Sequence, residues 1–133
     1  MTFMNLFNSV IFTLISSALC LSGYGQYFEK TFGDSLSQFG NAVQQTTDGG
    51  YIIAGFNDSI LASNVYLLKT DEEGNEEWSR TFGVSGWQKA KSVQQTTDGG
   101  YVIAGSFDGI GGYNAYLLKT DEEGNEEWNR TFG

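Results

Sequence analysis

The sequence predicts an all-β protein built from a repeated antiparallel unit, and three observations support this fold class. Residues 31–80 align with residues 81–130 without a gap and share 34 identities in 50 positions. Short apolar or alternating runs follow one another between turns rich in Gly and Asp, and no helical period is found after residue 26. A repeat of this length at a fixed spacing is typical of stacked supersecondary units.

Composition and charge limit the classes of function. The chain has 133 residues, 40% of them hydrophobic, which is too apolar for a disordered chain and enough for one modest core. Its net charge of −9 argues against nucleic acid or an anionic membrane as a partner, because no basic patch could displace counterions. The absence of His and the single Cys20 exclude Ser-His-Asp and Cys-His catalysis and a structural zinc site of N and S ligands.

Residues 1–25 are predicted to be a signal peptide. No charged side chain is found in residues 1–28, and residues 10–21 form an apolar run of the length expected for the core of such a peptide. Small residues follow at Gly23 and Gly25, so we place the cleavage before Gln26. An uncleaved anchor is the alternative, since Lys and Arg are missing from the N-terminal region, but a bilayer requires about 20 apolar residues. We therefore expect a secreted or cell-surface protein that is free of the membrane after cleavage.

The first half of each repeat is predicted to be a hairpin. Residues 42–46 alternate between the two faces of a strand, and Asp48 and Gly49 provide the Asp-Gly signal of a tight turn, in which glycine takes a positive φ. Residues 51–55, YIIAG, are apolar without interruption, which indicates a strand covered on both faces. The same pattern returns 50 positions later.

The second half of each repeat is predicted to hold two further strands. Residues 65–70 are apolar on both sides, residues 71–74 fit a type I turn, and residues 77–82 form the fourth strand. The connection before them, 56–64 and its copy 106–114, is expected to be an irregular loop, because the two copies differ most there. In repeat proteins, variable loops commonly carry specificity.

Four short antiparallel strands with apolar residues on both faces describe the blade of a β-propeller. Residues 27–33 are similar to the fourth strand at 77–83. We therefore predict a lone outer strand at 26–33, one blade at 34–83 and a second blade at 84–133. A propeller that completes its last blade with its first strand would begin in this way. Two blades cannot close a ring, so further blades or a homo-oligomer are expected.

The motifs TDGGYIIAG and YLLKTDEEGNEEW, spaced as here, resemble those of secreted bacterial and archaeal repeat proteins regarded as multi-bladed β-propellers. The resemblance covers residues 26–133. It implies an exported, non-enzymatic protein that binds or scaffolds at the cell surface, with more blades than two, of which this chain is the N-terminal part. The order of the motifs is also similar to blades of quinone-dependent propeller enzymes; that likeness is architectural, carries no cofactor residues over, and leaves us expecting no cofactor.

The acidic residues raise the question of a metal site. Ten of the sixteen acids lie in the two stretches 71–77 and 121–127, and clustered carboxylates can hold calcium. The alternative is a solvated hairpin tip that discourages pairing between sheet edges. We favour the tip and expect no metal, because these stretches lack the Asp and Gly spacing of a calcium loop.

Catalytic carboxylates are the next candidates to weigh. Asp58 and Asp108 lie in the expected irregular loops, and Asp48 and Asp98 lie in the first hairpins. Paired carboxylates can hydrolyse glycosides when a cleft holds them at a set separation. Asp in Gly-rich turns more often serves turn geometry, so we predict no catalytic residue.

Aromatic residues supply the candidate ligand contacts. Trp78 and Trp128 recur at the same place in the repeat, so we expect them to fill the space between blades rather than to stack on a ligand. Three aromatic residues have no aromatic counterpart in the first repeat. Together with the two loop carboxylates they form the predicted ligand site, for a carbohydrate or a protein at the cell surface: Asp58, Trp87, Phe107, Asp108 and Tyr113.

Two other functions stay open at this point. The first is a two-blade, lectin-like module that completes a ring by homo-oligomerisation. The second is a non-catalytic fragment of a secreted hydrolase or quinone-type enzyme.

Overall fold

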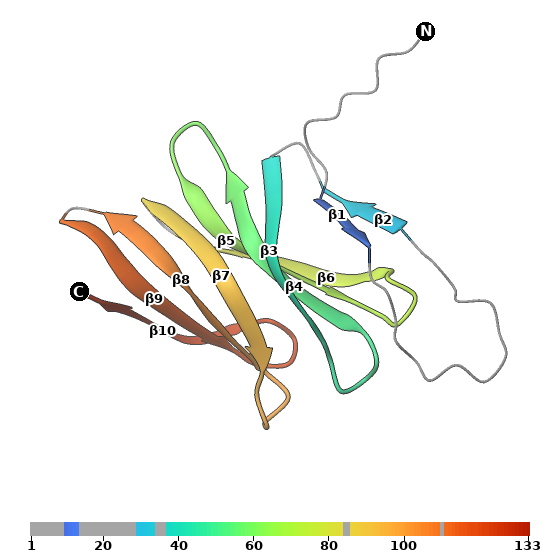
Figure 1. The fold of residues 1–133 in the computed structure, drawn as a ribbon. Coiled ribbons are helices and arrows are strands. Elements are labelled where there is room, and N and C mark those ends of the chain that lie inside the picture. The colour runs from blue at the N-terminus through green and yellow to red at the C-terminus, as the bar shows by residue number, and fades with distance from the viewer. Residues whose placement is uncertain (1–9, 14–28, 34–36, 84–85, 110) are drawn as a thin grey trace, which may run out of the picture.

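The computed structural model is all-β, as predicted, with one eight-stranded sheet and a short two-stranded sheet near the N-terminus (Figure 1). It describes residues 10–13, 29–33, 37–83, 86–109 and 111–133. No helix that could span a bilayer is found within these ranges. The strands are β1 (Val10–Thr13), β2 (Glu29–Phe32), β3 (Ser37–Gln45), β4 (Tyr51–Asp58), β5 (Ser63–Thr70), β6 (Glu76–Phe82), β7 (Trp87–Gln95), β8 (Tyr101–Gly109), β9 (Gly112–Thr120) and β10 (Glu126–Phe132).

Each copy of the repeat folds into one antiparallel meander. Strands β3, β4, β5 and β6 pair in chain order and are called the first unit; strands β7, β8, β9 and β10 do the same and are called the second unit. A single parallel pairing, Ser63 with Trp87, joins the two units. The strand order runs from β10 to β3 without returning, so the sheet of described strands is not closed into a barrel or ring.

The predicted Asp-Gly turn joins β3 to β4. Thr46 N donates to Gly50 O at 2.9 Å, and Gly49 N donates to Thr46 O at 3.0 Å. Gly49 has a φ of 90°, a left-handed conformation that glycine adopts without a steric penalty. The Asp48 carboxylate accepts hydrogen bonds from the Thr46 hydroxyl and from Gly50 N, which closes the turn through its side chain.

The acidic turn between β5 and β6 is held by its own first residue. Gly74 N donates to Asp71 O at 3.1 Å. The Asp71 carboxylate accepts from Asn75 N at 2.7 Å and from Asn75 Nδ2 at 2.8 Å. The same contacts recur at Asp121 and Asn125. One acid of each stretch is therefore used to shape the hairpin.

The prediction of an irregular loop at 56–64 and 106–114 is wrong. Strand β4 continues to Asp58 and β5 begins at Ser63, so only a short tip remains, closed by a bond from Ser59 N to Ala62 O of 2.9 Å. In the second unit, β8 reaches Gly109 and β9 begins at Gly112. A loop was expected because the two copies differ most there, but pairing with neighbouring strands overrides weak strand propensity.

The hydrophobic core lies between the two units. Its fully buried side chains come from both of them: Ile52, Ala54, Val65 and Leu67 from the first, and Ala90, Ile103 and Leu118 from the second. Trp78 packs edge-on against Tyr101 of the second unit, with ring centroids 5.9 Å apart, and the Arg80 guanidinium lies 5.5 Å from the Trp78 ring. Trp78 is thus part of the junction between units, as its position in the repeat predicts.

The N-terminal two-stranded sheet lies on the side of the first unit away from the second unit (Figure 1). Strand β2, within the predicted outer strand at 26–33, pairs antiparallel with β1, and Lys30 Nζ donates to Asn75 Oδ1 of the first unit at 3.0 Å. Strand β1 belongs to the predicted signal peptide. The predicted cleavage position before Gln26 lies outside the described residues.

Candidate functional site

Four of the five predicted ligand residues lie in one row across the sheet, at the end where β4 and β8 finish. Asp58 pairs with Ser63, Ser63 with Trp87, Trp87 with Asp108, and Asp108 with Tyr113. Side chains directly opposite each other on antiparallel strands have Cβ atoms about 5 Å apart and share a face. The register therefore aligns in one row residues up to 55 positions apart, which the sequence spacing alone did not show.

The aromatic members of this row reach solvent. Trp87 is 43% exposed and Tyr113 is 82% exposed, with Asp108 between them in the register. At the same end of the first unit, Ile60 and Leu61 on the β4–β5 tip are 95% and 82% exposed. An accessible aromatic pair with an intervening carboxylate can stack on the apolar face of a sugar ring and accept hydrogen bonds from its hydroxyl groups.

Phe107 does not belong to this row. It is half-buried and packs against the hydrophobic core, and its ring lies so close to Gly86 and Gly109 that a Cβ on either would come within 2.8 or 2.6 Å of it. Since neighbouring residues of a strand point to opposite faces, Phe107 faces away from Asp108. The predicted ligand contact Phe107 therefore lies apart from the row, and its ring packs against the core.

Asp58 has a partner within its own hairpin. Its carboxylate accepts a hydrogen bond from the Ser63 hydroxyl, and Ser63 is fully buried. Asp48 lies at the other end of the 8-residue strand β4, and a strand rises about 3.3 Å per residue, which places it about 25 Å away. The hairpin and row carboxylates of one unit are therefore too far apart to act as a glycosidase pair, which requires a separation below about 10 Å.

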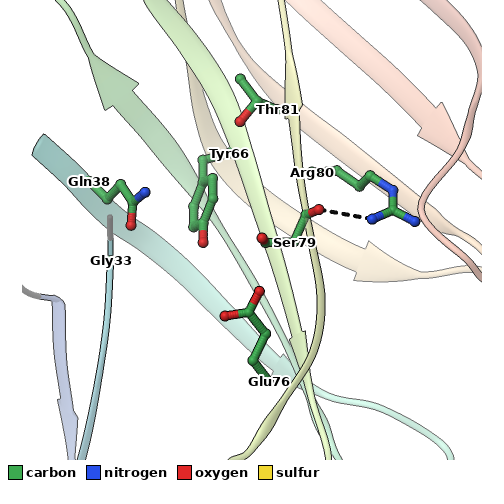
Figure 2. Close-up of a pocket in the computed structure, with 7 residues that line it drawn as sticks. All are labelled: Gly33, Gln38, Tyr66, Glu76, Ser79, Arg80 and Thr81. Atoms are coloured by element: carbon green, nitrogen blue, oxygen red, sulfur yellow. Dashed lines mark hydrogen bonds between the residues drawn. The ribbon is translucent and has the colours of Figure 1, made fainter. Parts of the chain in front are cut away.

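A polar pocket of about 220 Å³ lies where the end of β2 meets β3, β5 and β6 of the first unit (Figure 2). Seven residues line it: Gly33, Gln38, Tyr66, Glu76, Ser79, Arg80 and Thr81. The buried Oε1 of Gln38 has no hydrogen-bond partner among the described residues, and neither has that of its repeat counterpart Gln88. A pocket of this size and polarity can hold several waters. Gln38 was not among the predicted site residues, although its recurrence as Gln88 was a visible signal.

A buried lysine ties three segments of the first unit together at the turn end. Lys69 Nζ donates to the carboxylates of Asp48 at 2.8 Å and Glu77 at 2.7 Å, and to Thr70 O at 3.0 Å. The hydrogen bond from Lys69, followed by that from Thr46, lowers the pKa of Asp48 to about 2. Burial alone would lower the pKa of Lys69, but its hydrogen bonds to Asp48 and Glu77 reverse the direction and raise it.

The second unit repeats this ion cluster. Lys119 Nζ lies 3.0 Å from Asp98 and 2.8 Å from Glu127. The Thr96 hydroxyl, followed by Lys119, lowers the pKa of Asp98 to about 2. Two identical clusters fix the first hairpin of each unit to its third and fourth strands. Asp48 and Asp98 thus do more than shape a turn, and the lysine within each apolar LLKT run was the overlooked signal.

Among the described residues, no group of three or more His, Cys, Asp or Glu side chains is arranged to hold a metal ion. The chain matches no family model, and no curated protein resembles it in sequence.

Proposed function

We propose that this chain is part of an exported, non-enzymatic β-propeller-type protein that binds or scaffolds at the cell surface. The observation that carries the proposal is the packing of the first unit on the second. Trp78 and Phe82 of the first unit pack against the second, which presents the same residues again as Trp128 and Phe132. Units that pack through one recurring contact form either a ring or an extended array.

The second unit provides a specific reason to expect another unit beside it. Trp128 is 38% exposed and Phe132 is 56% exposed, whereas Phe82 is only 9% exposed. Repeat units generally require at least about three copies to bury their faces. We propose that a further unit, from the same protein or from another copy, covers this face.

Light scattering behind a sizing column tests this proposal on the chain freed of residues 1–25. We expect association at micromolar concentration, as a closed ring of identical subunits or as an aggregate, with three chains giving six units. Phe132→Arg should prevent this association, because it places a charge on the open face. A stable parent monomer that melts cooperatively would contradict the proposal and would indicate a self-contained β-sandwich.

A lectin-like role is the second candidate, and the row at Trp87, Asp108 and Tyr113 favours it. Ser63 of the first unit is the repeat counterpart of Tyr113. Ser63 pairs with Trp87, which is on the first strand of the second unit. A third unit packed in the same way would place its first strand beside Tyr113. A carbohydrate bound to this row would then lie at the junction between two units.

Titration of tryptophan fluorescence with neutral oligosaccharides tests the lectin-like role. Binding should be lost in Trp87→Ala and Tyr113→Ala and retained in Phe107→Leu, whose ring packs in the core. Binding that survives the first two changes would remove the row as the ligand site.

A further inference from the structure

We infer that strand β2 occupies the face of the first unit on which a second copy of this chain would dock, so that β2 weakens head-to-tail association of identical chains. This inference rests on the proposed function, in which the open face of the second unit is covered by a further unit. It adds that β2 competes with a second copy of the chain for the same face of the first unit.

The two faces that would meet already meet once within the chain. The second unit receives the first through buried side chains that include Tyr101, Ile103, Tyr116 and Leu118. The first unit carries the same residue types at the matching positions: Tyr51, Ile53, Tyr66 and Leu68. Ile53 and Leu68 are outside the cluster between the units, so they belong to the face turned away from the second unit. Docking of one copy's second unit on another copy's first unit would therefore recreate an established contact.

Strand β2 lies on this receiving side of the first unit, and two of its contacts correspond to contacts of β6 with the second unit. Arg80 on β6 lies against the β9–β10 turn, where its Cγ would be 3.1 Å from a Cβ on Gly124. Its counterpart on β2 is Lys30, which donates to Asn75 in the equivalent β5–β6 turn. A second pair of contacts corresponds in the same way. Gly83, after β6, lies close to Gln88 of the second unit, and its counterpart Gly33, after β2, lines the pocket together with Gln38, the counterpart of Gln88.

The pairing of β2 supports the same assignment. Phe32 pairs with Val10 and Thr31 with Ile11, while Phe82 pairs with Val65 and Thr81 with Tyr66. Phe32 and Thr31 of β2 are thus paired with an antiparallel neighbour, as their counterparts Phe82 and Thr81 are. Strand β1 belongs to the predicted signal peptide, so after cleavage β2 alone would hold this position.

A head-to-tail contact would bring two fourth strands to one place. The incoming second unit has its own fourth strand, β10, which requires the position that β2 holds. A heterologous contact of this kind forms only after β2 leaves, so the free energy of β2 docking opposes association. Released, β2 no longer competes.

Sedimentation velocity over a dilution series tests the inference, on the full chain and on the chain freed of residues 1–25. The double variant Lys30→Glu/Phe32→Asp removes the hydrogen bond to Asn75 and a half-buried ring, so it should lower the dissociation constant about tenfold. Thr31→Asp is the matched control, because Thr31 is exposed and lies on the other face of β2. Phe132→Arg should abolish association in both backgrounds.

The outcomes separate the inference from the proposed function. If neither the parent nor the double variant associates, the open face is not a docking surface and the proposed function fails. If both associate equally, β2 does not compete and only the inference fails. Weaker association of the double variant would show that β2 contributes to the contact, the opposite of our inference. Should the double variant not melt cooperatively, Lys30→Glu alone is measured, with an expected change of about threefold.

Discussion

The face of the first unit that packs on the second unit has an equivalent face on the second unit. The two faces carry similar side chains, but only the first is covered. Leu67 is fully buried and Phe82 is 9% exposed, whereas Leu117 is half-buried and Phe132 is 56% exposed. The repeated sequence specifies which residues lie on this face, and the presence of a neighbouring unit determines whether their side chains are buried. Burial at these positions is therefore a property of the junction between units.

The largest expected effect compares the same leucine in both units. Leu67→Ala should lower the free energy of unfolding by about 2 to 5 kcal/mol, because it leaves a cavity in the core between units. Leu117→Ala should cost about 1 kcal/mol, because that side chain is only half-buried. Urea denaturation of dilute protein measures both. Equal losses would show that the second face is covered in solution as well.

A second comparison concerns two tryptophans with different surroundings. Trp78→Ala should cost about 3 kcal/mol, because its ring packs on Tyr101 across the junction. Trp87→Ala should cost about 0.5 kcal/mol, because this side chain is 43% exposed at the end of a strand. The reverse order in chemical denaturation would contradict the faces assigned to the two side chains.

The ion cluster of the first unit predicts a dependence on pH. The pKa of Asp48 falls from 3.8 to about 2 on folding, so its contribution to stability is complete above about pH 4 and is lost as the pH falls through 2. Asp48→Asn should lower the unfolding free energy by about 1 kcal/mol at pH 7, a value reduced for the exposure of this carboxylate. The difference from the parent should shrink as the pH falls through 2 and vanish below it. Glu72→Gln, at the exposed tip, controls for the loss of one negative charge, and a difference that persists below pH 2 would argue against the ion pair.

Calcium should produce the smallest effect of all. Two acids of the first tip already have partners, since Asp71 accepts from Asn75 in the turn and Glu77 accepts from Lys69. Thermal melts with calcium and with a chelator should therefore coincide. A site filled at 100 times its dissociation constant would instead add about 2.7 kcal/mol, which a melt resolves readily.

The sequence predicted those parts of the structure that depend on local patterns. The Asp-Gly turn, the YIIAG and VYLLKT strands and the place of Trp78 in a junction follow from residues close together in the chain or from their recurrence. The ends of β4 and β5 were mispredicted, because polar residues there pair with neighbouring strands instead of forming a loop. Strand β3 begins at Ser37, five residues before the alternating segment at 42–46.

The candidate site was predictable by residue type and less so by orientation. Trp87 and Tyr113 were chosen because they have no aromatic counterpart in the first repeat, and Asp108 because it lies in the expected loop; the register places the three side by side. Phe107 satisfied the same criterion but points into the core, because one residue along a strand reverses the face. Lys69 was overlooked, since its partners lie 21 and 8 residues away and meet only in the folded sheet.

The lysine cluster also affects how such a chain can change in length. Asp48, Lys69 and Glu77 all belong to one unit, and a Cβ on Gly50 would lie 2.8 Å from Lys69 Nζ, so the glycine of DGG and the lysine of LLKT depend on each other. No member of the cluster comes from the neighbouring unit. A whole repeat can therefore be duplicated or deleted in the gene without separating the lysine from its carboxylate partners. Recombination inside a repeat keeps the cluster complete only when the two copies are joined at equivalent positions of the repeat.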